Sequence, residues 1–220
     1  MGKLFKNNGL TIVLMLLFLA SILGQWISGW MVENEELARH GEETLSLAAF
    51  AADPQFLSSV FENWESEFLQ MSAYVVLTAM LIQRGSAESR DPDDPPRDSG
   101  LERQSRDPGA PKILSAGRLA RALYARSLGT ALFALFLLSF LLHWSNSAAA
   151  AAAEAKQHGE AAVGPLAYLG GPQLWFESFQ NWQSEFLSTA VLIVLSIWLR
   201  QRESPESKAV AAPNDATGAA

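Results

Sequence analysis

The chain has 220 residues and contains no cysteine. This absence excludes disulfide bonds, thiolate nucleophiles and cysteine-ligated zinc or iron–sulfur centres. The sequence also lacks a phosphate-binding glycine loop, a nucleophile elbow, an HExxH zinc motif and a basic–aromatic patch suited to nucleic acid. We therefore expect that the protein is not an enzyme, does not bind nucleic acid, and needs no metal and no cofactor.

Apolar residues make up 49% of the chain, although its net charge is −7, and they gather in four runs. The runs cover residues 10–30, 68–82, 128–144 and 186–199. A helix needs about 20 mostly apolar residues to cross a bilayer core of about 30 Å. The first run meets this length and the third nearly does. The second and fourth reach only about 22 Å. To cross the bilayer, their helices must therefore include residues that precede the apolar run.

The sequence repeats itself at a constant offset of 118 positions, without a gap. The matching segments are Trp26 with Trp144, His40-Gly41-Glu42 with His158-Gly159-Glu160, Pro54-Gln55 with Pro172-Gln173, the box 61–69 with the box 179–187, and 83–89 with 201–207. Each copy contains two apolar runs. The sequence therefore predicts an all-α membrane protein whose four transmembrane helices form two tandem helical hairpins. Because each copy has an even number of spans, both hairpins insert in the same orientation, as a parallel internal repeat forming a four-helix bundle.

The positive charges are distributed unevenly around the four runs. Of the 16 lysines and arginines, only Arg39 and Lys156 lie in the loops inside the two copies. The others precede the first run, fill the segment between the second and third runs, or follow the fourth. Lysine and arginine are enriched on the cytoplasmic side of membrane proteins. We therefore expect a multi-pass protein with its N-terminus, C-terminus and middle segment in the cytoplasm.

Composition divides the chain into four parts. We predict a first transmembrane hairpin repeat at residues 1–89 and a second at residues 118–207. Residues 90–117, rich in Pro, Asp, Arg, Ser and Gly and poor in large apolar residues, are predicted to be a disordered cytoplasmic linker. The small and polar residues 208–220 are predicted to be a disordered tail.

Local signals place the helices of the first copy. The first helix is expected to run to about Trp30, with a short surface helix in the acidic loop near residues 34–50. Asp53-Pro54 is typical of an N-cap followed by proline in the first turn. The second helix is therefore expected to begin there and to run to about Arg84.

In the second copy, the third helix is expected to begin near Ala116 and to end at Trp144. The alanine-rich segment 148–156 is expected to form a helical part of the following loop. Glycine–proline pairs at 164–165 and 171–172 should break it before the fourth helix.

Polar side chains recur on one face of the second helix, where Asn63 and Glu67 are one turn apart. The matching residues of the second copy are Asn181 and Glu185. The predicted intramembrane polar cluster consists of Gln25, Asn63, Glu67, His143, Asn181 and Glu185. Ionisable residues within spans usually face the bundle interior or a wet cavity. If the two glutamates meet at the pseudo-twofold axis, like charges would keep one of them protonated.

Three interpretations of this cluster stay open. It binds a proton or cation, or receives a small solute. Alternatively, its members hydrogen-bond between helices and hold the two hairpins together. In a third interpretation, the acids reach the lipid headgroups and do little else.

Tryptophan and arginine are predicted to anchor the helices at the bilayer interfaces. The predicted anchors are Trp26, Trp64, Trp144, Trp182, Arg84 and Arg202. The repeated His-Gly-Glu motif supplies two imidazoles and two carboxylates, which a divalent metal could use. We interpret this motif as a solvated turn and predict no metal site.

The box Phe-x-Asn-Trp-x-Ser-Glu-Phe-Leu, followed by an apolar helix and Gln-Arg-x-Ser-x-Glu-Ser, resembles an uncharacterised family of bacterial integral membrane proteins. The resemblance covers residues 1–89 and 118–210. It implies a bacterial inner-membrane location and no particular activity, so no catalytic or binding residue follows from it. The first copy has Glu62, Glu65 and Gly85 where the second has Gln180, Gln183 and Glu203.

We therefore expect an integral membrane protein of unassigned activity, with a structural or interaction role in the bacterial cytoplasmic membrane. Its expected partners are the lipid bilayer and other membrane proteins or a second copy of the chain. The alternative is a conduit for protons, small ions or small solutes built on the polar cluster around Glu67 and Glu185.

Overall fold

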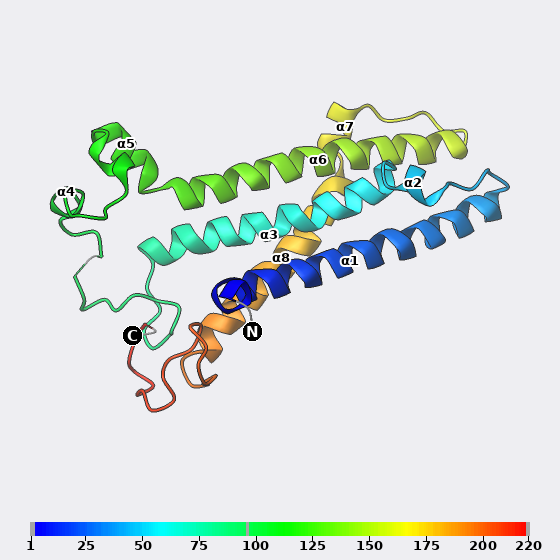
Figure 1. Cartoon of the computed structure of the whole chain (residues 1–220). Helices are drawn as coiled ribbons and strands as arrows, with labels where there is room; N and C mark the ends of the chain where they lie inside the picture. Colours follow the sequence, from blue (N-terminus) through cyan, green and yellow to red (C-terminus); the bar gives the residue numbers. More distant parts are fainter. Residues whose placement is uncertain (1–2, 96, 219–220) are drawn as a thin grey trace. The chain divides into compact units, whose positions relative to one another are not determined.

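The computed structural model describes residues 3–95 and 97–218. The elements are α1 (Lys3–His40), α2 (Leu47–Phe50), α3 (Pro54–Met80), α4 (Leu101–Gln104), the 3₁₀ helix η1 (Lys112–Ser115), α5 (Arg118–Tyr124), α6 (Ser127–Gln157), α7 (Pro165–Leu169) and α8 (Pro172–Leu195). Figure 1 shows these helices along the chain. The described residues contain no β-strand, so the predicted all-helical class is confirmed.

Helices α1 and α6 are long and apolar enough to cross a membrane. The apolar stretch of α1 has a mean hydropathy of 2.3, and that of α6 has 1.8. No residue of this 18-residue stretch of α1 is buried inside the protein, and 17% of the corresponding stretch of α6 is buried. Most of this apolar surface is therefore left for a partner other than the chain itself.

Both α3 and α8 begin at a proline, and the start of α3 at Pro54 is the one that the sequence predicted. At the start of α3, the backbone N–H of Gln55 donates to the Asp53 carboxylate at 2.8 Å. Gly171 precedes Pro172 at the start of α8. The two helices have 27 and 24 residues, which correspond to about 40 Å and about 36 Å of length. Each helix is therefore longer than its apolar run, because it also includes the repeated box at the start of that run.

Helix α1 is longer than predicted. It does not end near Trp30 but continues to His40, and the expected surface helix near residues 34–50 is reduced to the four residues of α2. Nothing in residues 31–40 breaks a helix, and ion pairs one turn apart support it, such as Glu35 with Arg39 at 3.6 Å. Gly41, with φ of 72°, then ends the helix.

Helix α6 also differs from the prediction at both ends. Residues 118–124 form a separate helix, α5, and α6 begins at Ser127. The helix passes through Trp144 without a break and continues to Gln157, because alanine favours helix more than any other residue. The alanine-rich segment is helical as predicted, but it belongs to α6 and not to a loop. Gly159, with φ of 70°, follows the helix end.

Contacts within the chain divide it into two compact units. Unit 1 contains residues 1–60 and 142–169, and unit 2 contains residues 61–141 and 170–220. Each unit therefore combines segments from both sequence copies. Met1, Gly2, Pro96, Ala219 and Ala220, which the predicted first repeat, linker and tail include, lie outside the described residues.

Unit 1 is held together where the chain returns after α1. The Asn34 side chain donates to the carbonyl of Leu45 at 2.9 Å and accepts from its N–H at 2.7 Å. Trp30 donates to the same carbonyl at 2.7 Å. A Cβ on Gly29 would lie 3.2 Å from the ring of Phe50, so the absence of a side chain there lets α2 approach α1 closely.

In unit 2, α3 and α6 approach at a small residue. A Cβ on Gly129 would lie 3.2 Å from Cγ2 of Val76. The Ser72 hydroxyl donates to the Gly129 carbonyl at 3.3 Å, beside this contact. Glycine at this position therefore sets the spacing of the two helices.

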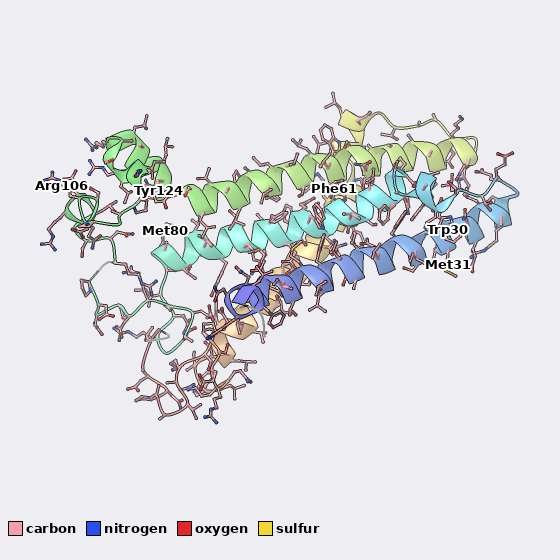
Figure 2. The ribbon with its side chains drawn as sticks, viewed as in Figure 1. Trp30, Met31, Phe61, Met80, Arg106 and Tyr124 are labelled. Atoms are coloured by element: carbon pink, nitrogen blue, oxygen red, sulfur yellow. The ribbon has the colours of Figure 1, made fainter. Side chains whose placement is uncertain are left out.

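Short helices and turns occur in the two segments that were predicted to be disordered. Residues 90–117 contain α4 and η1, and η1 packs on α5. Figure 2 shows the labelled side chains of Arg106 and Tyr124 in this part of the chain. In the tail, the buried Lys208 ammonium donates to backbone carbonyls, among them those of Gly85 at 2.6 Å and Ala216 at 2.9 Å. Disorder of these segments in solution stays a prediction.

Candidate functional site at the repeated box

The repeated box lies on α3 at residues 61–69 and on α8 at residues 179–187, and both copies belong to unit 2. Figure 2 labels Phe61, where the first box begins. The two copies share a local structure. The Ser66 hydroxyl donates to the Asn63 carbonyl at 2.9 Å, and the Ser184 hydroxyl donates to the Asn181 carbonyl at 2.8 Å.

The centre of the site is a buried carboxylate. Glu65 on α3 has 0% of its surface exposed. The indole N–H of Trp182 on α8 donates to its Oε1 at 2.9 Å. Burying a carboxylate is unfavourable unless hydrogen bonds compensate it, so this bond ties the side-chain position of Glu65 to the pairing of α3 with α8.

A second acid makes an equivalent link one turn earlier. The side-chain amide of Asn181 donates to Oε1 of Glu62. Glu62 and Glu65 occur only in the first copy, and the glutamines at the same places in the second copy, Gln180 and Gln183, are exposed. The two copies of the box therefore have different roles: the first supplies the acceptors and the second supplies the donors.

A third bond between α3 and α8 lies further along the two helices, at Gln70. We call the bonds of Glu62, Glu65 and Gln70 to α8 the polar seam. The Gln70 amide donates to the Thr189 hydroxyl at 2.5 Å. Beside the seam, the Trp182 ring packs on Phe136 of α6 with ring centroids 6.2 Å apart. Aromatic packing and hydrogen bonds thus hold α8 on the other helices of unit 2.

The six residues of the predicted polar cluster fall in different units. Gln25 and His143 belong to unit 1. The Gln25 amide donates to the Ser59 hydroxyl at 3.1 Å, which joins α1 to the first turns of α3. His143 is wholly buried on α6.

The remaining four members, the two asparagines and the two glutamates, belong to unit 2. Glu67 is exposed and Glu185 is half-buried. Asn63 is exposed, whereas Asn181 is part of the polar seam. Glu67 and Glu185 of the predicted polar cluster are near enough for the charge of Glu67 to influence Glu185.

The predicted anchors use their polar groups in different ways. The Trp26 indole donates to the Leu47 carbonyl at 3.1 Å, and the Trp144 indole donates to the Pro165 carbonyl at 2.9 Å. The two donors are 118 positions apart in the sequence, and so are the two acceptors. Unit 1 therefore contains the same contact twice, once from each copy. Trp64 packs edge-on against Phe61 at 5.6 Å.

The two predicted arginine anchors are well exposed. Arg84 forms an ion pair with Asp93 at 3.6 Å, and Arg202 forms one with Glu203 at 3.6 Å. Exposed ion pairs of this kind contribute little to stability. Their role at a bilayer interface stays a prediction.

The repeated His-Gly-Glu turns meet in unit 1. The rings of His40 and His158 are 5.9 Å apart and edge-to-face. The Gln157 amide also donates to the Glu42 carboxylate at 3.0 Å. Within residues 3–95 and 97–218, no three histidine, aspartate or glutamate side chains are arranged to hold a metal ion.

These turns border an acidic cavity of about 510 Å³. Its lining includes Glu33, Glu36, Glu42 and Asp53. Burial, and then the negative charges of Asp53, Glu36 and Glu42, raise the pKa of Glu33 above its ordinary value. The cavity therefore brings several carboxyl groups close together.

Glu62 and Glu65 of the polar seam were not predicted from the sequence, because the predicted polar cluster lies on the face of α3 that contains Asn63 and Glu67. Two signals could have found them. Ser58, Glu65 and Ser72 recur every seventh residue, and all three are buried. In addition, the first copy departs from the second at Glu62 and Glu65, and both departures mark residues that bond to α8.

A family model described as "Domain of unknown function (DUF6766)" matches residues 1–219. No curated protein and no solved structure matches the chain.

Proposed function

We propose that this chain, which belongs to the DUF6766 family of domains of unknown function, is an integral membrane protein with a structural or interaction role in a bacterial cytoplasmic membrane. In this proposal α1, α3, α6 and α8 supply the four spans, and the end of α1 beyond Trp30 lies outside the membrane. They form two tandem hairpins of the same orientation, and both termini lie in the cytoplasm. The lipid bilayer and either other membrane proteins or a second copy of the chain are the proposed partners.

The apolar surface of the helices supports the membrane location. Large apolar side chains on α1 and α6 are exposed, such as Leu16 at 61% and Leu128 at 63%. The same holds in the apolar halves of α3 and α8, for example Leu77 at 44% and Val191 at 45%. Lipid tails satisfy such surfaces, whereas water does not.

The polar seam is the observation that carries the structural role. Glu62, Glu65 and Gln70 each bond to a side chain of α8. Hydrogen bonds between spans favour helix association in a bilayer, where a polar group has few other partners. The polar side chains of the box are therefore best explained as contacts that join the two repeats.

A conduit for protons or small cations is the second candidate. The observation that favours it is the charge interaction between Glu67 and Glu185, which lie outside the polar seam. Two interacting carboxyls within spans suit a site that exchanges a proton or a cation.

Flux measurements in liposomes separate the two functions. The purified protein is reconstituted, and proton and potassium fluxes are compared with those of protein-free vesicles. The structural role predicts no flux above the protein-free level. If the wild type shows a flux that Glu67→Gln with Glu185→Gln abolishes while the protein stays folded, the conduit function replaces the structural one.

The matched control removes two negative charges outside the spans, at Glu102 and Glu203. Glu102→Gln with Glu203→Gln should leave any flux unchanged. Disassembly of the double variant at positions 67 and 185 in detergent would instead mean that these carboxyls are packing contacts.

A further inference from the structure

A cavity of about 340 Å³ lies between α3 and α8, and all the residues that line it belong to unit 2. Its α3 wall includes Tyr74 and Leu77, and its α8 wall includes Phe186 and Ile193. Glu88, in the segment that follows α3, also lines it. Small-molecule sites in proteins have volumes of about 300–1,000 Å³. The cavity therefore has room for a small ligand.

Several polar groups of the lining are engaged in contacts of the fold. The Gln70 amide of α3 donates to the Thr189 hydroxyl of α8, and both residues line the cavity. The Ser89 hydroxyl accepts from the backbone N–H of Gln83 at 3.0 Å. Leucine, isoleucine, alanine and phenylalanine make up most of the remaining lining. The ligand that suits this cavity is therefore mainly apolar.

The carboxyl of Glu88 is the exception in this lining. Its Oε2 accepts a hydrogen bond from the Tyr74 hydroxyl of α3. Its Oε1 is buried and accepts no hydrogen bond from the N–H and O–H groups that the structure describes. A buried carboxylate oxygen without a donor is unfavourable. A ligand that brings a hydrogen-bond donor to Oε1 would remove this unfavourable contribution.

The segment around Glu88 is fixed to both helices before a ligand binds. The backbone N–H of Glu88 donates to the Ser86 hydroxyl at 3.1 Å. The Ser86 hydroxyl lies 2.9 Å from that of Ser196, which follows the end of α8, and the N–H of Ala87 donates to the Ser196 hydroxyl at 3.2 Å. Tyr74 ties the carboxyl itself to α3. A carboxyl held in this way needs little reorganisation to accept a ligand.

The charge of the cavity indicates the sign of the ligand. Among the described residues that line it, Glu88 alone carries a formal charge. Across residues 3–95 and 97–218, no lysine or arginine forms an ion pair with this carboxyl. A negative charge without a partner in an apolar cavity is complementary to a ligand with one positive charge. The Tyr74 ring beside Glu88 also favours an ammonium group, because the face of an aromatic ring attracts cations.

We propose that this cavity is a binding site for a small amphiphilic amine, whose protonated ammonium group donates to Oε1 of Glu88 while its alkyl part lies between the apolar side chains of α3 and α8. The ligand neutralises the Glu88 carboxylate and contacts both copies of the repeat, so its binding strengthens the pairing of α3 with α8. A neutral alcohol of the same length lacks the charge, and a fatty acid anion is repelled by the carboxylate.

Isothermal titration calorimetry with three ligands of equal chain length tests this site. The full-length protein is purified in micelles of a neutral maltoside detergent, and the heat of titrating empty micelles is subtracted. At neutral pH, octylammonium should bind the wild type saturably, with one ligand per chain. Octanol and octanoate should bind about tenfold or more weakly, because neither can make a charged hydrogen bond to the carboxylate.

Three variants locate the binding. Glu88→Gln removes the charge and should weaken octylammonium binding by about tenfold or more. Ala190→Leu keeps the carboxylate but fills the cavity from the α8 side, where Ala190 lines it, and should weaken binding to a similar extent. Glu203→Gln is the matched control, because Glu203 is exposed and does not line the cavity. It should bind octylammonium as the wild type does.

Circular dichroism establishes that each variant is folded. If Glu88→Gln does not fold, Ala190→Leu and the comparison of the three ligands on the wild type still decide the result. The proposal is overturned if octylammonium shows no saturable binding beyond that of empty micelles, if octanol or octanoate binds equally well, or if the folded variants bind as the wild type does. Because the binding is measured on purified protein, its failure would leave the proposed structural role in the membrane intact.

Discussion

The bond between Glu65 and Trp182 gives the sharpest test of the polar seam. Glu65→Ala removes the buried acceptor and leaves the indole N–H of Trp182 without this partner. Trp182→Phe removes the donor. The double variant closes a thermodynamic cycle, which isolates the energy of this one pair from the other contacts that each side chain makes.

The expected magnitude follows from the burial and charge of the acceptor. A hydrogen bond to a charged group contributes about 1.5–3 kcal/mol in soluble proteins. Hydrogen bonds between membrane helices average about 0.6 kcal/mol, with a maximum near 1.7 kcal/mol. Because Glu65 is wholly buried, we expect a coupling energy of about 1–1.7 kcal/mol, at the upper end of the membrane range.

The free energy of unfolding is measured in mixed micelles by titration with a denaturing detergent, followed by circular dichroism. Gln183→Ala is the matched control, because Gln183 occupies the position of Glu65 in the second copy and is exposed. It should change stability by less than about 0.5 kcal/mol, as is usual for surface substitutions. A coupling energy below about 0.3 kcal/mol, which is indistinguishable from additivity, would refute the reasoning.

Three further predictions concern other contacts. The hydroxyls of Ser58 and Ser147 are 2.5 Å apart, so the double variant Ser58→Cys with Ser147→Cys should form a disulfide on mild oxidation. Because the chain has no other cysteine, a shift in mobility on a non-reducing gel reports this disulfide alone. Gly129→Leu should reduce the free energy of unfolding by about 1–3 kcal/mol, because even a Cβ there would lie 3.2 Å from Cγ2 of Val76 and a larger side chain would push α3 and α6 apart. Glu33 has a raised pKa, so stability should fall as the pH rises through that value, and Glu33→Gln should flatten this dependence in thermal unfolding; an unchanged slope would contradict the assignment.

The sequence predicted the helical elements well where the signal was local. Prolines at 54 and 172 mark the starts of α3 and α8 because proline suits the first turn of a helix. The helix ends were predicted less well. The apolar run of α1 stops near Trp30, but the helix continues to His40, because hydropathy reports the length of an apolar surface and not the end of a helix.

The candidate site was predicted only in part. The helical period alone directed attention to the face of α3 with Asn63 and Glu67, and the charge of Glu67 does influence Glu185. The period did not identify which face of α3 would meet α8, since both faces of the box carry polar residues. The buried face contains Glu65, and its contact with Trp182 depends on the pairing of two segments 117 residues apart.

The measurement that tests the central claim most directly is the sidedness of the two repeats. Single cysteines at Glu43, Ser99 and Ala161 are introduced one at a time into the cysteine-free chain, and intact cells are treated with a membrane-impermeant maleimide. Two hairpins of the same orientation predict that Glu43→Cys and Ala161→Cys are labelled from outside, while Ser99→Cys is labelled only after the membrane is opened. Labelling of Ser99→Cys in intact cells, or recovery of the chain as a soluble monomer without detergent, would contradict it.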